Sequence, residues 1–219
     1  MVLRAALFDF DGTLVDTTEL IYQSMRHATG EVLGRNDLPR GVLMANVGQP
    51  MPRQMELLDA ERAEELLESY RLYNDEHHDS LIRAFPGVEE SLARLRSAGV
   101  KIAVVTSKRR SSVEMDLKGF PKLGEVVDRF VTMEDTEEHK PLPGPLLKGL
   151  ELLGGVPKEE AAYVGDSPFD VAAAKAAGVT SVAVSWGAFS EDTLREAEPD
   201  YLVPDIDSAV DVLLEMRGR

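Results

Sequence analysis

One stretch near the start of the chain decides both its fold and its chemistry, Leu7-Phe8-Asp9-Phe10-Asp11-Gly12-Thr13-Leu14. An apolar run ends there in two carboxylates, and a glycine follows. In an extended chain, residues two apart point the same way, so Asp9 and Asp11 are predicted to face one small volume at a strand's carboxyl end. Two carboxylates that close need a metal cation or a shared proton. Both arrangements suit phosphoryl transfer, although an Asp-x-Asp-Gly sequence is also compatible with a strand end followed by a turn.

Composition limits the possible partners. The 219 residues carry a formal net charge of -15 and include no cysteine. A field of that sign repels nucleic acid and anionic membrane surfaces, so we expect neither as a partner. The lack of cysteine excludes disulfides, thiolate nucleophiles and thiolate-bound zinc. No signal-peptide pattern and no apolar run of membrane length are present, so we expect a cytoplasmic protein.

After Phe85-Pro86-Gly87, β-branched apolar runs alternate with amphipathic helical patterns, which predicts a parallel sheet covered by helices on both faces. Strands are expected at residues 2–8, 100–105, 126–132, 161–164, 180–184 and 201–203, and helices at 88–98, 110–119, 143–153, 168–177 and 206–216. Residues 16–82 interrupt this alternation once with helices, the first of which is expected to stop at Gly30. We therefore predict an α/β, Rossmann-like three-layer core, residues 1–15 and 83–219, with an inserted small α-helical cap, residues 16–82.

Polar residues follow the expected strands where a parallel sheet binds its ligands, at the carboxyl ends. Thr106 and Ser107 follow the second strand, and a hydroxyl with free backbone N–H groups can clamp phosphate oxygens. Lys140, in a loop after the third strand, would balance the carboxylates and bind a phosphate oxygen. Asp166 and Asp170 are four residues apart at a helix start, where both can lean towards one metal. Helix capping by Thr106 or Asp166 and a solvated Lys140 are the simpler alternatives.

The expected cap contains two groups of candidates. Gln49 and Arg53, beside Gly48, could reach down onto a substrate, although an exposed arginine at a helix start is the simpler reading. His77 and His78 lack the spacing to other histidines that a zinc site requires. We expect them to pack or to form hydrogen bonds at the cap junction.

Four of these pieces, in this order and spacing, resemble the haloacid dehalogenase-like phosphatase superfamily over essentially the whole chain. They are Asp9-Phe10-Asp11-Gly12-Thr13, Thr106-Ser107-Lys108, Lys140-Pro141, and Gly165-Asp166 with Asp170. The insert resembles the helical cap of the phosphoglycolate-phosphatase-like branch. Within that branch, several stretches are similar to PpaX-type inorganic pyrophosphatases, namely Thr18-Glu19-Leu20-Ile21, Tyr70-Arg71-Leu72-Tyr73-Asn74 and Val131-Thr132-Met133-Glu134-Asp135. Met51-Pro52-Arg53 in the cap matches neither subgroup, which leaves phosphoglycolate-type phosphomonoesters and pyrophosphate open as substrates.

The resemblance implies a mechanism and a cofactor. Asp9 would attack phosphorus and form an aspartyl-phosphate, while Asp11 would act first as the acid and then as the base. Mg2+ would be held by the Asp9 carboxylate, the Asp11 backbone carbonyl and Asp166, with support from Asp170. Thr106 and Lys140 would hold the transferring phosphoryl oxygens, and the cap would close over the small phosphorylated substrate.

Three other functions share parts of this pattern. A phosphomutase of the β-phosphoglucomutase type has all four motifs and stays open as an alternative. A 2-haloacid dehalogenase needs no proton donor at Asp11, and a non-catalytic relative should have lost at least one of the motif residues, so both are disfavoured.

Overall fold

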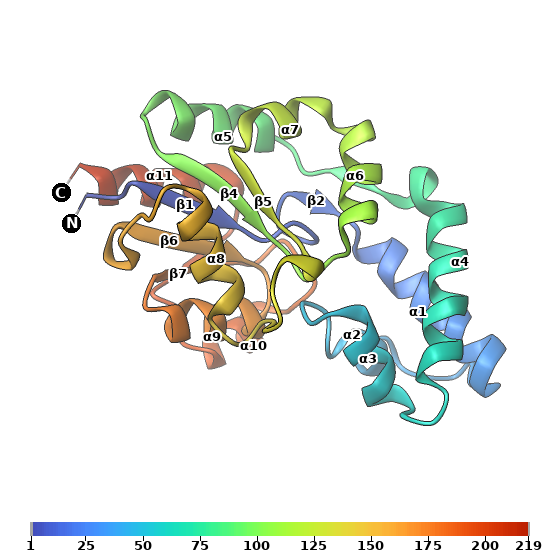
Figure 1. Ribbon diagram of the computed structural model, residues 1–219. Helices are drawn as coiled ribbons and strands as arrows, with labels where there is room; N and C mark the ends of the chain where they lie inside the picture. The colour runs from blue at the N-terminus through green and yellow to red at the C-terminus, as the bar shows by residue number, and fades with distance from the viewer. Residues whose placement is uncertain (1, 219) are drawn as a thin grey trace.

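The computed structural model describes residues 2–218 and contains a six-stranded parallel sheet in the order β5-β4-β1-β6-β7-β8 (Figure 1). Its strands are β1 (Ala5–Phe8), β4 (Lys101–Val105), β5 (Arg129–Val131), β6 (Ala161–Gly165), β7 (Thr180–Val184) and β8 (Tyr201–Val203). The first strand lies in the middle of the sheet, where Leu7 is in register with Ala103 on one side and Tyr163 on the other. The predicted α/β, Rossmann-like fold is confirmed.

Alternating side chains on β1 divide the core into two layers. Ala6 and Phe8 belong to the apolar cluster of one face, and Ala5 and Leu7 belong to that of the other, as the two-residue period of a strand requires. The first face is covered by α5 (Val88–Ser97), α7 (Pro121–Val126) and α11 (Ile206–Arg217), and the second by α8 (Gly144–Leu152) and α9 (Pro168–Ala177). Four shorter or flanking elements complete the core, namely α6 (Arg110–Gly119), α10 (Glu191–Glu196), η1 (Met133–Asp135) and η2 (Lys158–Glu160). With both faces covered, every central strand is apolar on both sides.

Four helices lie together beside the sheet (Figure 1), namely α1 (Thr18–Leu33), α2 (Arg40–Met44), α3 (Met51–Leu58) and α4 (Ala63–Leu81). They share an apolar cluster of their own, with Met25, Met55 and Leu66 fully buried in it. The chain leaves the core through β2 (Val15–Asp16) and returns through β3 (Arg83–Ala84), and these two strands pair antiparallel. Both ends of the proposed cap, residues 16–82, therefore lie at one short ladder.

Some predicted boundaries were wrong, each for a local reason. Helix α1 continues through Gly30 and ends at Gly34, which has a φ of 68°. A Cβ at residue 30 would overlap the Asn36 side chain, so glycine serves close approach there instead of termination. Pro121 starts helix α7, whose last residue lies where a strand was expected, so β5 is limited to Arg129–Val131. Helix α10, capped by the Ser190 side chain, was not predicted.

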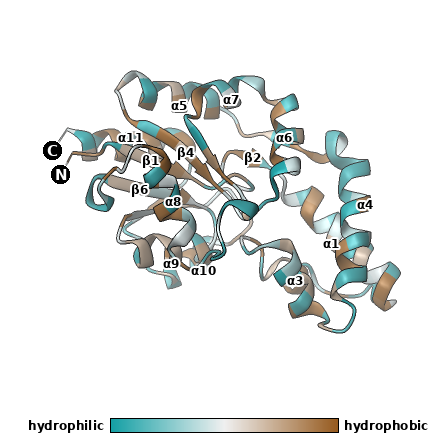
Figure 2. Ribbon diagram, in the orientation of Figure 1, coloured by the Kyte–Doolittle hydropathy of each residue, from teal (hydrophilic) through white to brown (hydrophobic). Residues whose placement is uncertain are grey.

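Hydropathy follows this arrangement (Figure 2). Hydrophobic residues gather in the central strands, whereas α4 is hydrophilic over much of its surface. Within residues 2–218, none of the helices combines the length and the apolar content that crossing a bilayer demands.

Candidate active site

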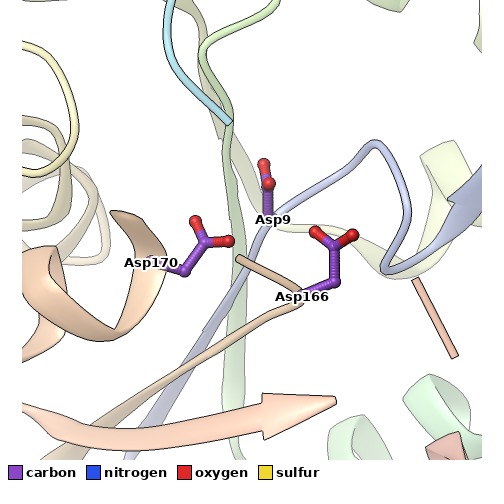
Figure 3. A group of neighbouring side chains, drawn as sticks. All are labelled: Asp9, Asp166 and Asp170. Carbon is purple, nitrogen blue, oxygen red and sulfur yellow. The ribbon is translucent and has the colours of Figure 1, made fainter. Parts of the chain in front are cut away.

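Three buried carboxylates converge at the carboxyl end of the central strands. Asp9 follows β1, Asp166 follows β6, and Asp170 lies in the first turn of α9. Each offers an oxygen within 4.8 Å of the others, and the three side chains surround one small space (Figure 3). The sequence prediction that Asp9, Asp166 and Asp170 come together is therefore matched by the geometry.

Lys140 supplies the positive charge of this cluster. Its Nζ lies 3.0 Å from Asp9 Oδ1 and 2.7 Å from Asp170 Oδ1, and its side chain is 1% exposed. Burial acts to lower the pKa of this ammonium, but Asp170 and Asp9 outweigh burial and hold the pKa above its usual value. Lys140 is therefore a buried cation fixed against the carboxylates and not a solvated surface lysine.

Tyr163, which sequence reasoning did not single out, completes the support of Lys140. Its hydroxyl accepts a hydrogen bond from Lys140 Nζ at 3.0 Å, and it has Val105 O at 2.9 Å and Asp170 Oδ1 at 3.1 Å as acceptors for its own proton. Tyrosine is common in strands, so the sequence held no local signal for this role.

The cluster is short of positive charge. Burial, opposed by Lys140 and assisted by Asp170, raises the pKa of Asp9 from 3.8 to about 7. Burial and the neighbouring Asp170 and Asp9 raise the pKa of Asp166 well above its usual value. Asp9 Oδ1 is buried and, among residues 2–218, has no well-directed hydrogen-bond donor. Three buried carboxylates with one lysine among them suit a hard divalent cation such as Mg2+, which prefers oxygen ligands.

The three carboxylates differ in how free they are to bind a cation. Asp170 Oδ2 accepts from the backbone and the hydroxyl of Ser167 at 3.0 and 2.6 Å, while Oδ1 contacts Lys140 and Tyr163. Asp166 uses only Oδ2, which accepts from Ala188 N at 2.6 Å. Gly12 allows this carboxylate to approach, because its φ is 74° and a Cβ there would overlap Asp166. Asp9 and Asp166 are thus the freer ligands, with Asp170 in support.

Asp11 has a different environment from Asp9, although both line the same cavity. Its Oδ1 accepts hydrogen bonds from Thr17 Oγ1 and Lys108 Nζ, both at 2.8 Å, and its side chain is 18% exposed. Strand β1 ends at Phe8 and the chain then turns, so Asp9 and Asp11 lie after the strand and not within it. The Asp11 carboxylate lies outside the three-carboxylate group, and metal binding by its backbone carbonyl remains a prediction.

A cavity of about 90 Å³ lies between the core and the inserted segment, where α1, α3 and α4 contribute to its lining. Thr106 and Ser107 line it from the core, and Ser107 Oγ donates to Gly48 O at 2.7 Å. Gln49 lines it from the opposite side, where its side chain also donates to Asn46. Arg53 does not line this cavity. It pairs with Glu56 at 2.9 Å, its side chain is 56% exposed, and its role in substrate binding remains a prediction.

Further polar residues lie behind Asp11, among them Asp116, which the sequence reasoning missed, and His78, which was expected to pack or form hydrogen bonds at the cap junction. Lys108 Nζ lies 2.6 Å from Asp116 Oδ2, and Asp116 Oδ1 lies 2.5 Å from His78 Nε2. Asp11 and Asp116 raise the pKa of Lys108 against the opposing effect of burial. Lys108 was visible as the residue after Thr106-Ser107, but nothing local linked Asp116 or His78 to it.

Comparison with known proteins agrees with this geometry. Residues 6–184 match the family model described as haloacid dehalogenase-like hydrolase. The chain is 42% identical over 206 residues to "Putative pyrophosphatase PpaX" of Caldanaerobacter subterraneus subsp. tengcongensis, covering 94% of this chain and 92% of that protein. It is 37% identical over 218 residues to pyrophosphatase PpaX of Bacillus mycoides, covering all of both chains. The crystal structure of a predicted phosphatase from Clostridium acetobutylicum superposes with a TM-score of 0.87 at 26% identity, covering 98% of this chain and 100% of that one.

Proposed function

The chain belongs to the haloacid dehalogenase-like hydrolases and is a phosphatase of that family, and from this premise we propose that it is a Mg2+-dependent pyrophosphatase that works through an aspartyl-phosphate on Asp9. One observation carries the proposal. Asp9 is a buried carboxylate, 3% exposed, that lines the cavity while Lys140 lies 3.0 Å from its Oδ1. A nucleophile held in this way can meet a phosphoryl group only from the cavity side.

The chain's own residues account for both steps. In the first, an Asp9 oxygen bonds to phosphorus, the anhydride P–O bond breaks, and Asp11 gives its proton to the departing phosphate. In the second, water attacks the phosphorus of the aspartyl-phosphate, its proton passes to Asp11, and the Asp9 carboxylate is restored with a second phosphate. Lys140 and the Thr106 hydroxyl would stabilise charge on the transferring phosphoryl oxygens.

Mg2+ fits the site as a bound cofactor held by Asp9 and Asp166, with Asp170 in support and the Asp11 carbonyl as a further ligand. When bound, the cation supplies positive charge to the phosphoryl oxygens and to the carboxylate cluster. The raised pKa of Asp9 and that of Asp166 support this assignment, because burial, together with the neighbouring carboxylates, raises both by more than Lys140 lowers them.

Two observations support pyrophosphate over larger substrates. The relatives named pyrophosphatase PpaX match this chain along nearly its full length. The cavity of about 90 Å³ has room for only several water molecules, which favours a compact substrate. The same cavity is lined by the basic side chains of Arg71 and Arg109, which suit an anionic leaving group.

A phosphate-release screen with Mg2+ tests the proposal, using pyrophosphate, phosphoglycolate, sugar phosphates and nucleotides. Pyrophosphate is expected to give the highest kcat/KM, and Asp9→Asn is expected to lose turnover while keeping the wild-type circular dichroism spectrum. Asp192→Asn, an exposed carboxylate in α10, serves as the matched control. Near-wild-type turnover by Asp9→Asn would refute the nucleophile. A preference for phosphoglycolate would refute the substrate, and conversion of β-glucose 1-phosphate without net phosphate release would favour the mutase.

A further inference from the structure

A line of four hydrogen-bonding or ion-paired side chains leads from the active site to helix α4. Asp11 Oδ1 is 2.8 Å from Lys108 Nζ, which is 2.6 Å from Asp116 Oδ2. The other oxygen of Asp116 lies 2.5 Å from Nε2 of His78. Lys108 follows β4, Asp116 lies on α6 and His78 lies in the last turn of α4. These contacts therefore join the core to α4, which belongs to the inserted segment, residues 16–82.

These groups are too deeply buried for a surface ion-pair network. The side chain of Asp116 is 0% exposed, that of His78 is 3% exposed and that of Lys108 is 13% exposed. An unpaired charge at such depth is strongly unfavourable, so each member depends on the next one for compensation. If α4 moved away from α6, Asp116 would lose its contact with His78 and, within residues 2–218, would keep its ion pair with Lys108 alone.

The same contacts divide the two oxygens of Asp11. Thr17 and Lys108 both donate to Oδ1, and no donor among residues 2–218 is bonded to Oδ2. Oδ2 is therefore the oxygen left for a proton that moves to or from a reacting group. Lys108 fixes the carboxylate through one oxygen without occupying the other.

We propose that Asp116 and His78 are positioning residues, which hold Lys108 against Asp11 and make that contact depend on the docking of α4 against α6. The inference rests on the proposed function, because it takes Asp11 as the acid and base. Lys108 orients the Asp11 carboxylate, and Asp116 orients Lys108. His78 contacts Asp116 from α4, so the orientation of Lys108 depends on where α4 lies. The acid is thus aligned for proton transfer when the cavity is covered.

Leaving groups provide a readout that a merely structural role would not give. An alkyl phosphate such as phosphoglycolate needs a proton on its leaving oxygen, whereas p-nitrophenol departs readily as an anion. If Lys108 positions the acid, Lys108→Met should lower kcat for phosphoglycolate about 10- to 100-fold but that for p-nitrophenyl phosphate less than about 3-fold. Lys118→Met, an exposed lysine of α6, is the matched control and should behave as wild type.

A double-mutant cycle tests whether Asp116 acts through Lys108. Asp116→Asn alone should lower kcat for phosphoglycolate about 3- to 10-fold, with less than about a 2-fold further loss when it is added to Lys108→Met. The double variant removes the Lys108–Asp116 ion pair as a unit, so neither of these two residues is left as an unpaired buried charge. Equal losses on both substrates, or independent losses from the two substitutions, would overturn the proposal. Glu114→Gln, on the exposed side of α6, is the carboxylate control.

An unfolding cycle separates failure of this inference from failure of the proposed function. His78→Leu and Lys108→Met alter side chains that both contact Asp116, so their shifts of the urea midpoint are expected to be non-additive. If the wild-type protein releases no phosphate from pyrophosphate, phosphoglycolate or p-nitrophenyl phosphate, the proposed function fails, and the contacts from Asp11 to His78 are then tested by this unfolding cycle alone. Additive shifts would overturn it whatever the activity.

Discussion

Replacing Tyr163 by phenylalanine tests how the buried lysine of the site is held in place. The substitution removes one hydroxyl and keeps the ring, which is 1% exposed in the core under α8 and α9. The hydroxyl contacts Lys140 Nζ, Val105 O and Asp170 Oδ1 at 3.0, 2.9 and 3.1 Å. Lys140 keeps its contacts with Asp9 and Asp170, so the cation stays in the site with one acceptor fewer.

The magnitude follows from the two hydrogen bonds that one hydroxyl can make here. A bond involving a charged group contributes about 1.5–3 kcal/mol and a neutral one about 0.5–1.5 kcal/mol, so the free energy of unfolding should fall by about 2–4 kcal/mol. For a chain of this size that corresponds to a loss of about 5–15 °C in Tm. Because misplacement of Lys140 is limited by its remaining partners, kcat should fall by only about 3- to 10-fold.

Urea and thermal unfolding followed by circular dichroism, with phosphate release measured in parallel, provide the assay. Tyr201→Phe is the matched control, since Tyr201 is a half-buried strand residue of β8 whose hydroxyl makes no hydrogen bond within residues 2–218. An unchanged Tm in Tyr163→Phe, or an equal loss in both variants, would refute the assignment of these hydrogen bonds to the support of Lys140.

Three further predictions concern the metal and its ligands. Excess EDTA should remove phosphate release, and added Mg2+ should restore it; activity unaffected by chelation would contradict the metal site. Burial is the main cause that raises the folded-state pKa of Asp9 from 3.8 to about 7. Between these pH values the metal-free folded state binds more protons than the unfolded state. The free energy of unfolding of the metal-free protein should therefore fall as pH rises from about 4 to 7. Mg2+ must displace that proton, so the Mg2+-induced increase in Tm should be larger at pH 8 than at pH 5.5, and an equal increase would contradict the linkage. Gly12→Ala should lower the free energy of unfolding by more than about 1 kcal/mol and weaken Mg2+ binding, because residue 12 has a φ of 74° and a Cβ there would overlap the Asp166 side chain. Wild-type values for both quantities would show that Asp166 can move aside.

The sequence was informative wherever one strand end could be judged alone. The apolar runs located β1, β4, β6 and β7, and the topology of a parallel sheet then brought Asp9, Asp166 and Asp170 to one edge. Lys140 was predictable because it follows the third expected strand and supplies positive charge that the carboxylates at that sheet edge require. Each of these inferences needed only local pattern and the direction of the chain.

Other parts of the site depend on contacts that no local pattern reveals. Tyr163 reaches Lys140 because the register of β6 places it beside Leu7, and register comes from the whole sheet. Asp116 and His78 are 38 positions apart and meet only because α4 returns against α6. Gly30 was predicted to end a helix because glycine often does so. It lies inside α1 instead, where the lack of a side chain lets Asn36 approach, and a sequence does not display that contact. These errors share one cause, which is that tertiary packing decided the outcome.

The same distinction explains how two similar aspartates acquire different tasks. In the sequence, Asp9 and Asp11 differ only by position. In the structure, Asp9 is buried beside Lys140 and two further carboxylates, whereas Asp11 is 18% exposed and bonded to Thr17 and Lys108. A buried carboxylate short of positive charge favours a cation and suits attack on phosphorus. A carboxylate held through one oxygen, while no donor within residues 2–218 is bonded to the other, suits proton transfer. The proposed division into nucleophile and acid–base therefore arises from the packing around each residue and not from the motif that contains them both.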